Sequence, residues 1–288
     1  MIEVAWLKRD VMEVAGADAE TYLQGQLSQD VAALAVGASA ISFVLQPQGK
    51  VDALVRVSRT APDTFVVDVE GGFGPAVAAR LERFLLRTKA TVTALDDWRV
   101  LALWGDEPTA LVELARQDAE AAVAAPLDWP GLEGAVALGP DLVVPPGAHE
   151  RSSADHEARR VGAGWPAMGR ELDAGTIPAE AGQGVIDRAV SFTKGCYTGQ
   201  ELVARVDSRG GNVPRRLRRL RIDEGVPAEG SPVVVDAKEV GRVTSVVPTG
   251  RGAVALAYVG RAVEPPATAT LGADGQWVAQ IEEIPLLG

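Results

Sequence analysis

Residues 194–201 read Lys-Gly-Cys-Tyr-Thr-Gly-Gln-Glu, and apolar residues follow this stretch at helical spacing. Thr198 and Glu201 match a T-x-x-E capping box, so the pattern predicts a helix that begins just after the cysteine. Unpaired amides at the start of a helix, with Lys194 nearby, favour the thiolate form of Cys196. One interpretation is therefore a reactive cysteine. The other is a small buried residue beside a helix start, because free cysteine is among the most buried residue types.

Cys196 is the only cysteine of the chain, and the two histidines are His149 and His156. A single cysteine excludes an internal disulfide, a CxxC redox pair and a zinc ribbon, and it indicates a reducing compartment. Iron-sulfur clusters usually need about four thiolates. We therefore expect no permanently bound metal.

The length of 288 residues predicts two or three domains. The net charge is −11, and this acidity disfavours non-specific binding to nucleic acid or to anionic membranes. No apolar run approaches the roughly 20 residues that span a bilayer, and the first residues lack the pattern of a secretion signal. We expect a soluble, cytoplasmic protein with no membrane partner.

Periodicity and turn residues predict strands and helices that alternate with short connections in the first half of the chain. The expected helices are 17–35, 75–88, 107–124 and 153–161, and the expected strands are 41–45, 51–57, 65–69 and 98–104. Strands 51–57 and 65–69 should pair in antiparallel fashion across Ala61-Pro62-Asp63. The Pro- and Gly-rich residues 126–148 indicate a domain edge, and 162–184 should form a long shaped loop. This half is therefore expected to be α+β.

From Pro214 onward, short strand-like runs alternate with turn residues. They are 217–222, 233–235, 240–246, 253–259 and 277–281. Several short strands with regular turn signals are typical of a barrel. A small C-terminal β-barrel is therefore expected.

The arginine-rich run 215–221 stands out in an acidic chain. Together with Arg205 and Arg209 it could form a patch for phosphate or polycarboxylate. Charges on a strand edge also discourage aggregation, and no aromatic residues lie between these arginines to stack bases. A solvated strand edge is the favoured interpretation, and we do not expect a nucleic-acid partner.

Several catalytic patterns are missing from the sequence. It contains no GxxxxGK[ST], no GxGxxG after a strand and no HExxH around either histidine. Residues 191–194 match SxxK, but no SDN or KTG motif accompanies them, so chance explains this match better. These absences disfavour nucleotide-binding and zinc-protease functions.

The stretch 194–201 resembles the K-G-C-[FY]-x-G-Q-E signature of the YgfZ-like folate-binding proteins, a family associated with iron-sulfur protein maturation. Four further segments, which carry the resemblance across nearly the whole chain, are similar to that family: 22–31, 45–50, 175–182 and 189–194. These proteins are similar in turn to the T protein of the glycine cleavage system, an aminomethyltransferase.

The resemblance implies a three-domain cloverleaf around a central hole that could hold tetrahydrofolate. Two domains are expected to be α+β, and the third is the C-terminal β-barrel. The first domain would be discontinuous, with residues 1–45 and 150–213, and it would carry the cysteine motif. The second would span 46–149, and the barrel 214–288.

The resemblance also implies two folate contacts. Asp52 falls where the aminomethyltransferases carry an Asp-Asp pair, and Arg160 falls on an arginine of their folate-site helix. A carboxylate can accept from pterin or anilino N–H groups, and a guanidinium can clamp the glutamate tail of folate. A sheet-edge charge and a helix-surface charge are the alternatives. The chain departs from the transferase pattern at Ala53, Val69 and Gly162, where the transferases have Asp, Asn and Glu.

The function implied is a tetrahydrofolate-binding accessory protein that supports assembly or repair of iron-sulfur proteins, with Cys196 as its reactive group. Its partners would be reduced folate and iron-sulfur client or assembly proteins. Lys194 would raise the local positive potential, and five residues would shape or line the site: Gly195, Tyr197, Gly199, Gln200 and Glu201. The alternative is an enzyme, a folate-dependent one-carbon transferase or demethylase that uses Asp52.

Overall fold

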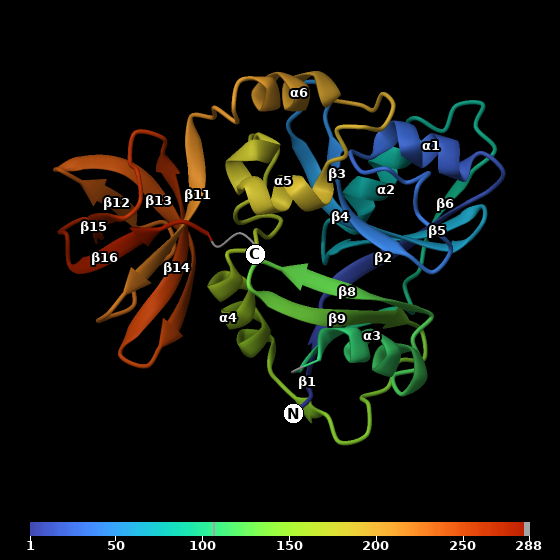
Figure 1. Ribbon diagram of the computed structural model, residues 1–288, viewed down its shortest axis with the longest axis horizontal. Helices are drawn as coiled ribbons and strands as arrows, with labels where there is room; N and C mark the ends of the chain where they lie inside the picture. The colour runs from blue at the N-terminus through green and yellow to red at the C-terminus, as the bar shows by residue number, and fades with distance from the viewer. Residues whose placement is uncertain (106, 285–288) are drawn as a thin grey trace. The chain divides into compact units, whose positions relative to one another are not determined.

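The computed structural model describes residues 1–105 and 107–284, and Figure 1 shows its helices and strands. The chain forms two compact units. The first unit contains Met1–Asp128, Glu133–Ser153 and Asp187–Leu202. The second contains Trp129–Leu132, Ala154–Ile186 and Val203–Gly288. The predicted ranges of three domains, and the central hole, stay predictions.

One sheet of the first unit has the strand order β3-β4-β5-β2-β6, and its neighbouring strands are antiparallel. Helices α1 (Ala19–Gln26) and α2 (Gly74–Glu82) pack against it. The register pairs Val57 with Val67, which confirms the predicted antiparallel pairing. The strands are β2 (Arg9–Ala15), β3 (Ser39–Leu45), β4 (Val51–Ala61), β5 (Thr64–Glu70) and β6 (Thr91–Ala94).

A second sheet has the order β10-β1-β7-β9-β8, and helix α3 (Pro108–Gln117) packs against its strand β7. Apolar side chains of the two sheets, among them Val11, Val66, Val100 and Leu138, are buried together in one cluster, which accounts for much of the packing in this unit. The strands are β1 (Glu3–Leu7), β7 (Arg99–Trp104), β8 (Val123–Trp129), β9 (Leu132–Gly139) and β10 (His149–Glu150).

The second unit contains a closed barrel, drawn in orange to red in Figure 1, with the strand order β11-β14-β13-β12-β15-β16. Buried Val, Leu, Ile and Ala side chains fill its interior. The barrel confirms the C-terminal prediction. Its strands are β11 (Arg215–Ile222), β12 (Pro232–Val235), β13 (Lys238–Thr249), β14 (Gly252–Gly260), β15 (Ala267–Leu271) and β16 (Trp277–Glu282).

The remaining helices carry or flank the predicted site residues. They are α4 (Ser153–Ala163), the 3₁₀-helix η1 (Pro178–Ala181), α5 (Gln183–Ala189) and α6 (Gln200–Ser208). Val161 of α4 packs against Leu217 and Leu256 of the barrel within the second unit. No helix in the described part of the chain is long and apolar enough to cross a membrane.

Three helix predictions were too long, and several elements were not predicted. These are helix α5 and the strands β1, β2, β6, β8, β10 and β15. The helix expected over 17–35 ends at Gln26, because the side chain of Gln24 accepts hydrogen bonds from the amides of Val31 (2.8 Å) and Ala32 (3.1 Å) and folds the chain back. Helices α2 and α3 end at Glu82 and Gln117, before the predicted 88 and 124. Among the strands not predicted, β15 is short and contains two alanines, which have low strand propensity.

Candidate functional site

Cys196 lies in the irregular segment between α5 and α6, and its side chain is exposed to solvent. The adjacent Gly195 is exposed as well, and a methyl group added to it would meet no atom within 4 Å. The thiol is therefore accessible to a ligand or a second protein. This exposure separates the two interpretations of the cysteine, because it is not a packed core residue.

Lys194 fixes one end of the cysteine loop. Its Nζ atom donates hydrogen bonds to the carbonyl oxygens of Gln24 (2.6 Å), Leu27 (2.7 Å) and Gln29 (2.9 Å). An ammonium has three donors, so all of them are used. The positive charge also lies at the C-terminal end of α1, where the helix dipole is negative. Lys194 therefore joins the loop to the segment that follows α1.

Gly199 fixes the other end of the loop. Its φ of +83° suits glycine, and a Cβ at this position would lie 2.5 Å from the carbonyl oxygen of Gln46 and 2.8 Å from Cβ of Leu45. Gly49 is packed as closely against α6, since a Cβ at this position would lie 2.4 Å from Cβ of Leu202. The turn after β3 and the start of α6 are thus in direct backbone contact. Two of the segments that carry the family resemblance meet here.

Thr198 and Glu201 do not form the predicted capping box. Within the described residues, the Thr198 hydroxyl donates to the carbonyl of Gly25 (3.5 Å), as does the Thr198 amide (3.0 Å). The side chain that caps the start of α6 is Gln200, whose Oε1 accepts from the amide of Tyr197 at 3.1 Å. Glu201 is exposed in the first turn of α6, where a negative charge is favourable.

Burial shifts the ionisation of the two side chains that flank the cysteine. Burial lowers the pKa of Lys194 to about 8, although the charge of Asp30 opposes this shift. Burial raises the pKa of Tyr197 to about 12. The Lys194 ammonium lies 5.1 Å from the centre of the Tyr197 ring, a distance typical of a cation–π contact. Lys194 thus remains mostly charged at neutral pH beside an un-ionised phenol.

Asp52 lies at the start of β4 and lines a pocket of about 530 Å³ in the first unit. The apolar lining residues are Val44, Phe73, Ala76, Val77 and Ala79, and the charged ones are Asp52, Arg80 and Arg83. Ligand pockets are usually apolar concavities of about 300–1,000 Å³ with few polar groups. Its size and lining therefore suit a small molecule.

Arg80 of α2 connects this pocket to the segment that holds the cysteine loop. Its Nε lies 3.4 Å from Oδ2 of Asp52, and its two other nitrogens donate to the Gln26 side chain (3.1 Å) and to the carbonyl of Leu45 (3.2 Å). Gln26 follows Gly25, the partner of Thr198. The pocket and the cysteine loop therefore share the last turn of α1.

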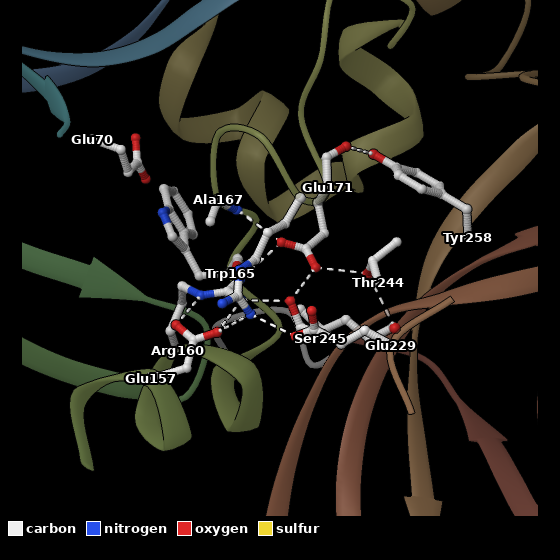
Figure 2. A network of polar contacts seen from close by, with 12 residues as sticks. Glu70, Glu157, Arg160, Trp165, Ala167, Glu171, Glu229, Thr244, Ser245 and Tyr258 are labelled. Carbon is white, nitrogen blue, oxygen red and sulfur yellow. Dashed lines mark hydrogen bonds and ion pairs between the residues drawn. The ribbon is translucent and has the colours of Figure 1, made fainter. Parts of the chain in front are cut away.

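Arg160 lies in the second unit, and Figure 2 shows the polar network around it. Its Nε and Nη2 donate to the carboxylate of Glu157 (2.9 and 2.6 Å), and Nη2 also donates to Ser245 (2.7 Å). Nη1 donates to the Trp165 carbonyl (2.5 Å) and to Glu171 (2.9 Å). All five N–H donors of the guanidinium are used within the protein. Arg160 could bind a folate carboxylate only by giving up a present partner.

Glu171 is the centre of this network, although no motif in the sequence marks it. Its buried carboxylate accepts from Arg160, from the amide of Ala167 (3.0 Å) and from the hydroxyls of Thr244 and Ser245 (both 2.6 Å). A single glutamate within a Gly- and Pro-rich loop has no spacing that could reveal this role. Burial lowers the pKa of Arg160, but the hydrogen bonds that it donates to Glu157 and the charge of Glu171 outweigh this and raise it.

The arginine run is neutralised by neighbouring groups within the second unit. Arg215 lies 3.1 Å from Glu180, Arg219 lies 2.9 Å from Glu282, and Arg218 pairs with Glu283. Arg221 pairs with Asp223, and Arg216 donates to the carbonyl of Gly211 at 2.7 Å. These contacts argue against a phosphate-binding patch. The expected solvated strand edge is also wrong, because β11 lies in a closed barrel, where it pairs with β14 along its length and with β16 from Arg219 to Ile222.

No group of three or more His, Cys, Asp or Glu side chains among residues 1–105 and 107–284 is arranged to hold a metal ion. Cys196, Lys194, Asp52 and the other predicted residues of the motif lie in the first unit, and Arg160 lies in the second.

No protein-family model matches the chain. It is 28% identical over 273 residues to the mitochondrial iron-sulfur cluster assembly factor IBA57 of Homo sapiens, covering 87% of this chain and 75% of that protein. It is 29% identical over 220 residues to the tRNA-modifying protein YgfZ of Enterobacter sp., covering 69% and 65%. A match to an aminomethyltransferase of Streptomyces avermitilis is 39% identical over 121 residues but spans only 32% of that protein.

The crystal structure of glycine cleavage system aminomethyltransferase T from Bartonella henselae superimposes with a TM-score of 0.77. The match covers 99% of this chain and 86% of that chain at 19% identity, so it establishes the fold alone. The predicted resemblance is thereby confirmed: the chain is a homologue of proteins named YgfZ and IBA57, and it has the fold of the aminomethyltransferase T protein.

Proposed function

We propose that this chain is a tetrahydrofolate-binding accessory protein that supports assembly or repair of iron-sulfur proteins. The observation that carries the proposal is the exposed thiol of Cys196 in a loop fixed at both ends, by Lys194 on one side and Gly199 on the other. The fixed ends hold the thiol at one exposed position, where a ligand or a client can reach it. The name of the human relative, an iron-sulfur cluster assembly factor, supports a role in iron-sulfur protein assembly.

Asp52 and its pocket would take part in holding the folate. The carboxylate can accept from an anilino or pterin N–H group, and the apolar wall of Val44, Phe73 and Val77 suits an aromatic ring. A bound reduced folate would supply a one-carbon unit or reducing equivalents. Arg160 would stabilise the second unit rather than bind folate, because its donors already make hydrogen bonds within that unit.

Cys196 would be the reactive group of the protein. An exposed thiol can contact the folate, ligate the iron of a client transiently or exchange with a thiol of a client. Lys194 would position the loop and keep a positive charge beside the sulfur. Tyr197 and Gln200 would fix the start of α6.

Complementation tests this proposal. In a strain that lacks the gene, the activities of iron-sulfur enzymes should fall, and the wild-type gene should restore them. Cys196→Ala should fail to restore them. Asp97→Asn, at an exposed aspartate outside the pocket, is the control for Asp52→Asn and should restore them fully. Full complementation by Cys196→Ala would contradict the role of the thiol.

A binding titration tests the folate part separately. The purified protein should bind tetrahydrofolate, and Asp52→Asn should weaken this binding, because it removes one negative acceptor from the pocket. Protein that binds no reduced folate would overturn this part, whatever the complementation shows.

An aminomethyltransferase-type enzyme is the second candidate, favoured by the position of Asp52 in a ligand-sized pocket and by the partial match to a transferase. Asp52 would then orient N10 of the folate or accept its proton, which is worth about 10²–10⁴ in rate. If Asp52→Asn abolishes complementation while Cys196→Ala preserves it, the interpretation as an enzyme is correct. The opposite pattern supports the accessory protein.

A further inference from the structure

We propose that Arg83, supported by Arg80, binds the glutamate carboxylates of folate in the pocket beside Asp52. The inference rests on the proposed function and deepens it by assigning the glutamate end of the ligand to these two arginines. Arg160 was expected to bind the glutamate tail of folate, but all five of its donors are used within the protein. Another guanidinium is therefore needed for this role.

The pocket of about 530 Å³ is lined by two arginines, Arg80 and Arg83. Arg80 and Arg83 are three residues apart at the C-terminal end of α2, so they lie on the same side of that segment. Asp52 contributes one negative charge against these two positive charges. The pocket thus has a net positive charge in a chain whose net charge is −11. This favours an anionic ligand.

The two arginines differ in what they already contact. Arg80 is mostly buried, and Asp52, Gln26 and the Leu45 carbonyl hold its guanidinium in place. The Arg83 side chain is exposed, and its guanidinium makes no hydrogen bond or ion pair with the described residues of the chain. Its planar fork of donors is therefore open to a carboxylate, which it could bind through two parallel hydrogen bonds.

The remaining lining suits the rest of such a ligand. Phe73, Val44 and Val77 form an apolar wall, and Asp52 supplies one acceptor for an N–H group. A molecule that carries a carboxylate, an aromatic ring and an N–H group could contact all of these lining residues. The aminobenzoyl-glutamate part of folate carries these three groups.

Binding measurements with two ligands test the assignment. Tetrahydropteroate has the pterin and aminobenzoyl groups of tetrahydrofolate but no glutamate. Wild-type protein should bind tetrahydrofolate about 10- to 100-fold more tightly, because a charge-assisted bidentate contact is lost with tetrahydropteroate. Arg83→Gln should remove this difference by weakening tetrahydrofolate binding and leaving tetrahydropteroate binding unchanged.

Arg87→Gln is the matched control, because Arg87 is an exposed arginine four residues further on that does not line the pocket. It should leave both affinities unchanged. Thermal unfolding of both variants checks that they fold. Equal affinity of the wild type for the two ligands, or equal weakening of both by Arg83→Gln, would overturn the assignment while leaving folate binding intact. If neither ligand binds, the proposed function itself is wrong and the assignment is wrong with it.

Discussion

The ammonium group of Lys194 donates a 2.6 Å hydrogen bond to the carbonyl oxygen of Gln24, a residue 170 positions earlier in the chain. With its bonds to Leu27 and Gln29, this contact ties the cysteine motif to the other main segment of the family resemblance. The motif lysine is therefore a positioning residue as well as a source of charge.

Lys194→Met should destabilise the protein by about 1.5–3 kcal/mol, because it removes the donors from three carbonyl groups. Urea unfolding at pH 7 measures the change. Lys50→Met, at an exposed lysine of the turn after β3, should change the stability by less than about 0.5 kcal/mol. Equal effects of the two substitutions would show that the three bonds add nothing.

Gly199→Ala should destabilise the protein by at least about 2 kcal/mol, because a Cβ would collide with the Gln46 carbonyl and the backbone has a positive φ. Gly195→Ala, four residues earlier in the same loop, has free space for its methyl group and should be tolerated. Denaturant unfolding of the two variants in parallel gives the comparison. A tolerated Gly199→Ala would mean that the loop does not press against the turn after β3.

Cys196 should react with a thiol reagent such as 5,5′-dithiobis(2-nitrobenzoate) in the folded protein, with one equivalent released and no denaturant needed. Because the side chain is exposed, Cys196→Ala should change the free energy of unfolding by no more than about 0.5 kcal/mol. A thiol that reacts only after unfolding would contradict its exposed position.

Arg160→Met should destabilise the protein by about 3–5 kcal/mol, since the buried carboxylate of Glu171 loses its charged partner and Ser245 loses a donor. Arg170→Met is the surface comparison, because Arg170 also pairs with Glu157 but is 42% exposed. That change should cost less than about 1 kcal/mol. Calorimetric unfolding should separate the two variants clearly, and a small effect at Arg160 would contradict its central position in the network.

All three tyrosines of the chain should resist ionisation. Burial raises the pKa of Tyr22 to about 12, although Arg80 opposes it, burial raises the pKa of Tyr197 to about 12, and burial with nearby Glu180 raises that of Tyr258. The unfolded chain should titrate near pH 10. The unfolded state therefore loses protons first, so these groups contribute stability below pH 10 that is lost as the pH rises through 12.

Absorbance at 295 nm measures this directly. At pH 10 the folded protein should show little tyrosinate, and the signal should appear when urea unfolds the chain at the same pH. Half-ionised tyrosines in the folded protein at pH 10 would contradict their burial.

Sequence alone identified the signals that are local in the chain. The spacing of apolar residues and turn residues predicted the barrel, the β4–β5 pairing and the existence of the main helices, because these depend on neighbours a few residues apart. The predicted end of the first helix was wrong, because the Gln24 side chain binds the amide of Val31 and the helix ends at Gln26. The cysteine motif was identified from its residues, and the structure added that Cys196 is exposed.

The roles of the charged residues depend on tertiary contacts, since most of their partners come from distant parts of the chain. The structure shows that Arg160 is saturated by Glu157, Glu171 and Ser245, and that Lys194 is bonded to the last turn of α1 and to the segment after it. It also placed Arg80 and Arg83 beside Asp52 in one pocket. The free energy of a buried or paired charge depends on groups that folding brings together, and no local pattern in the sequence contains that information.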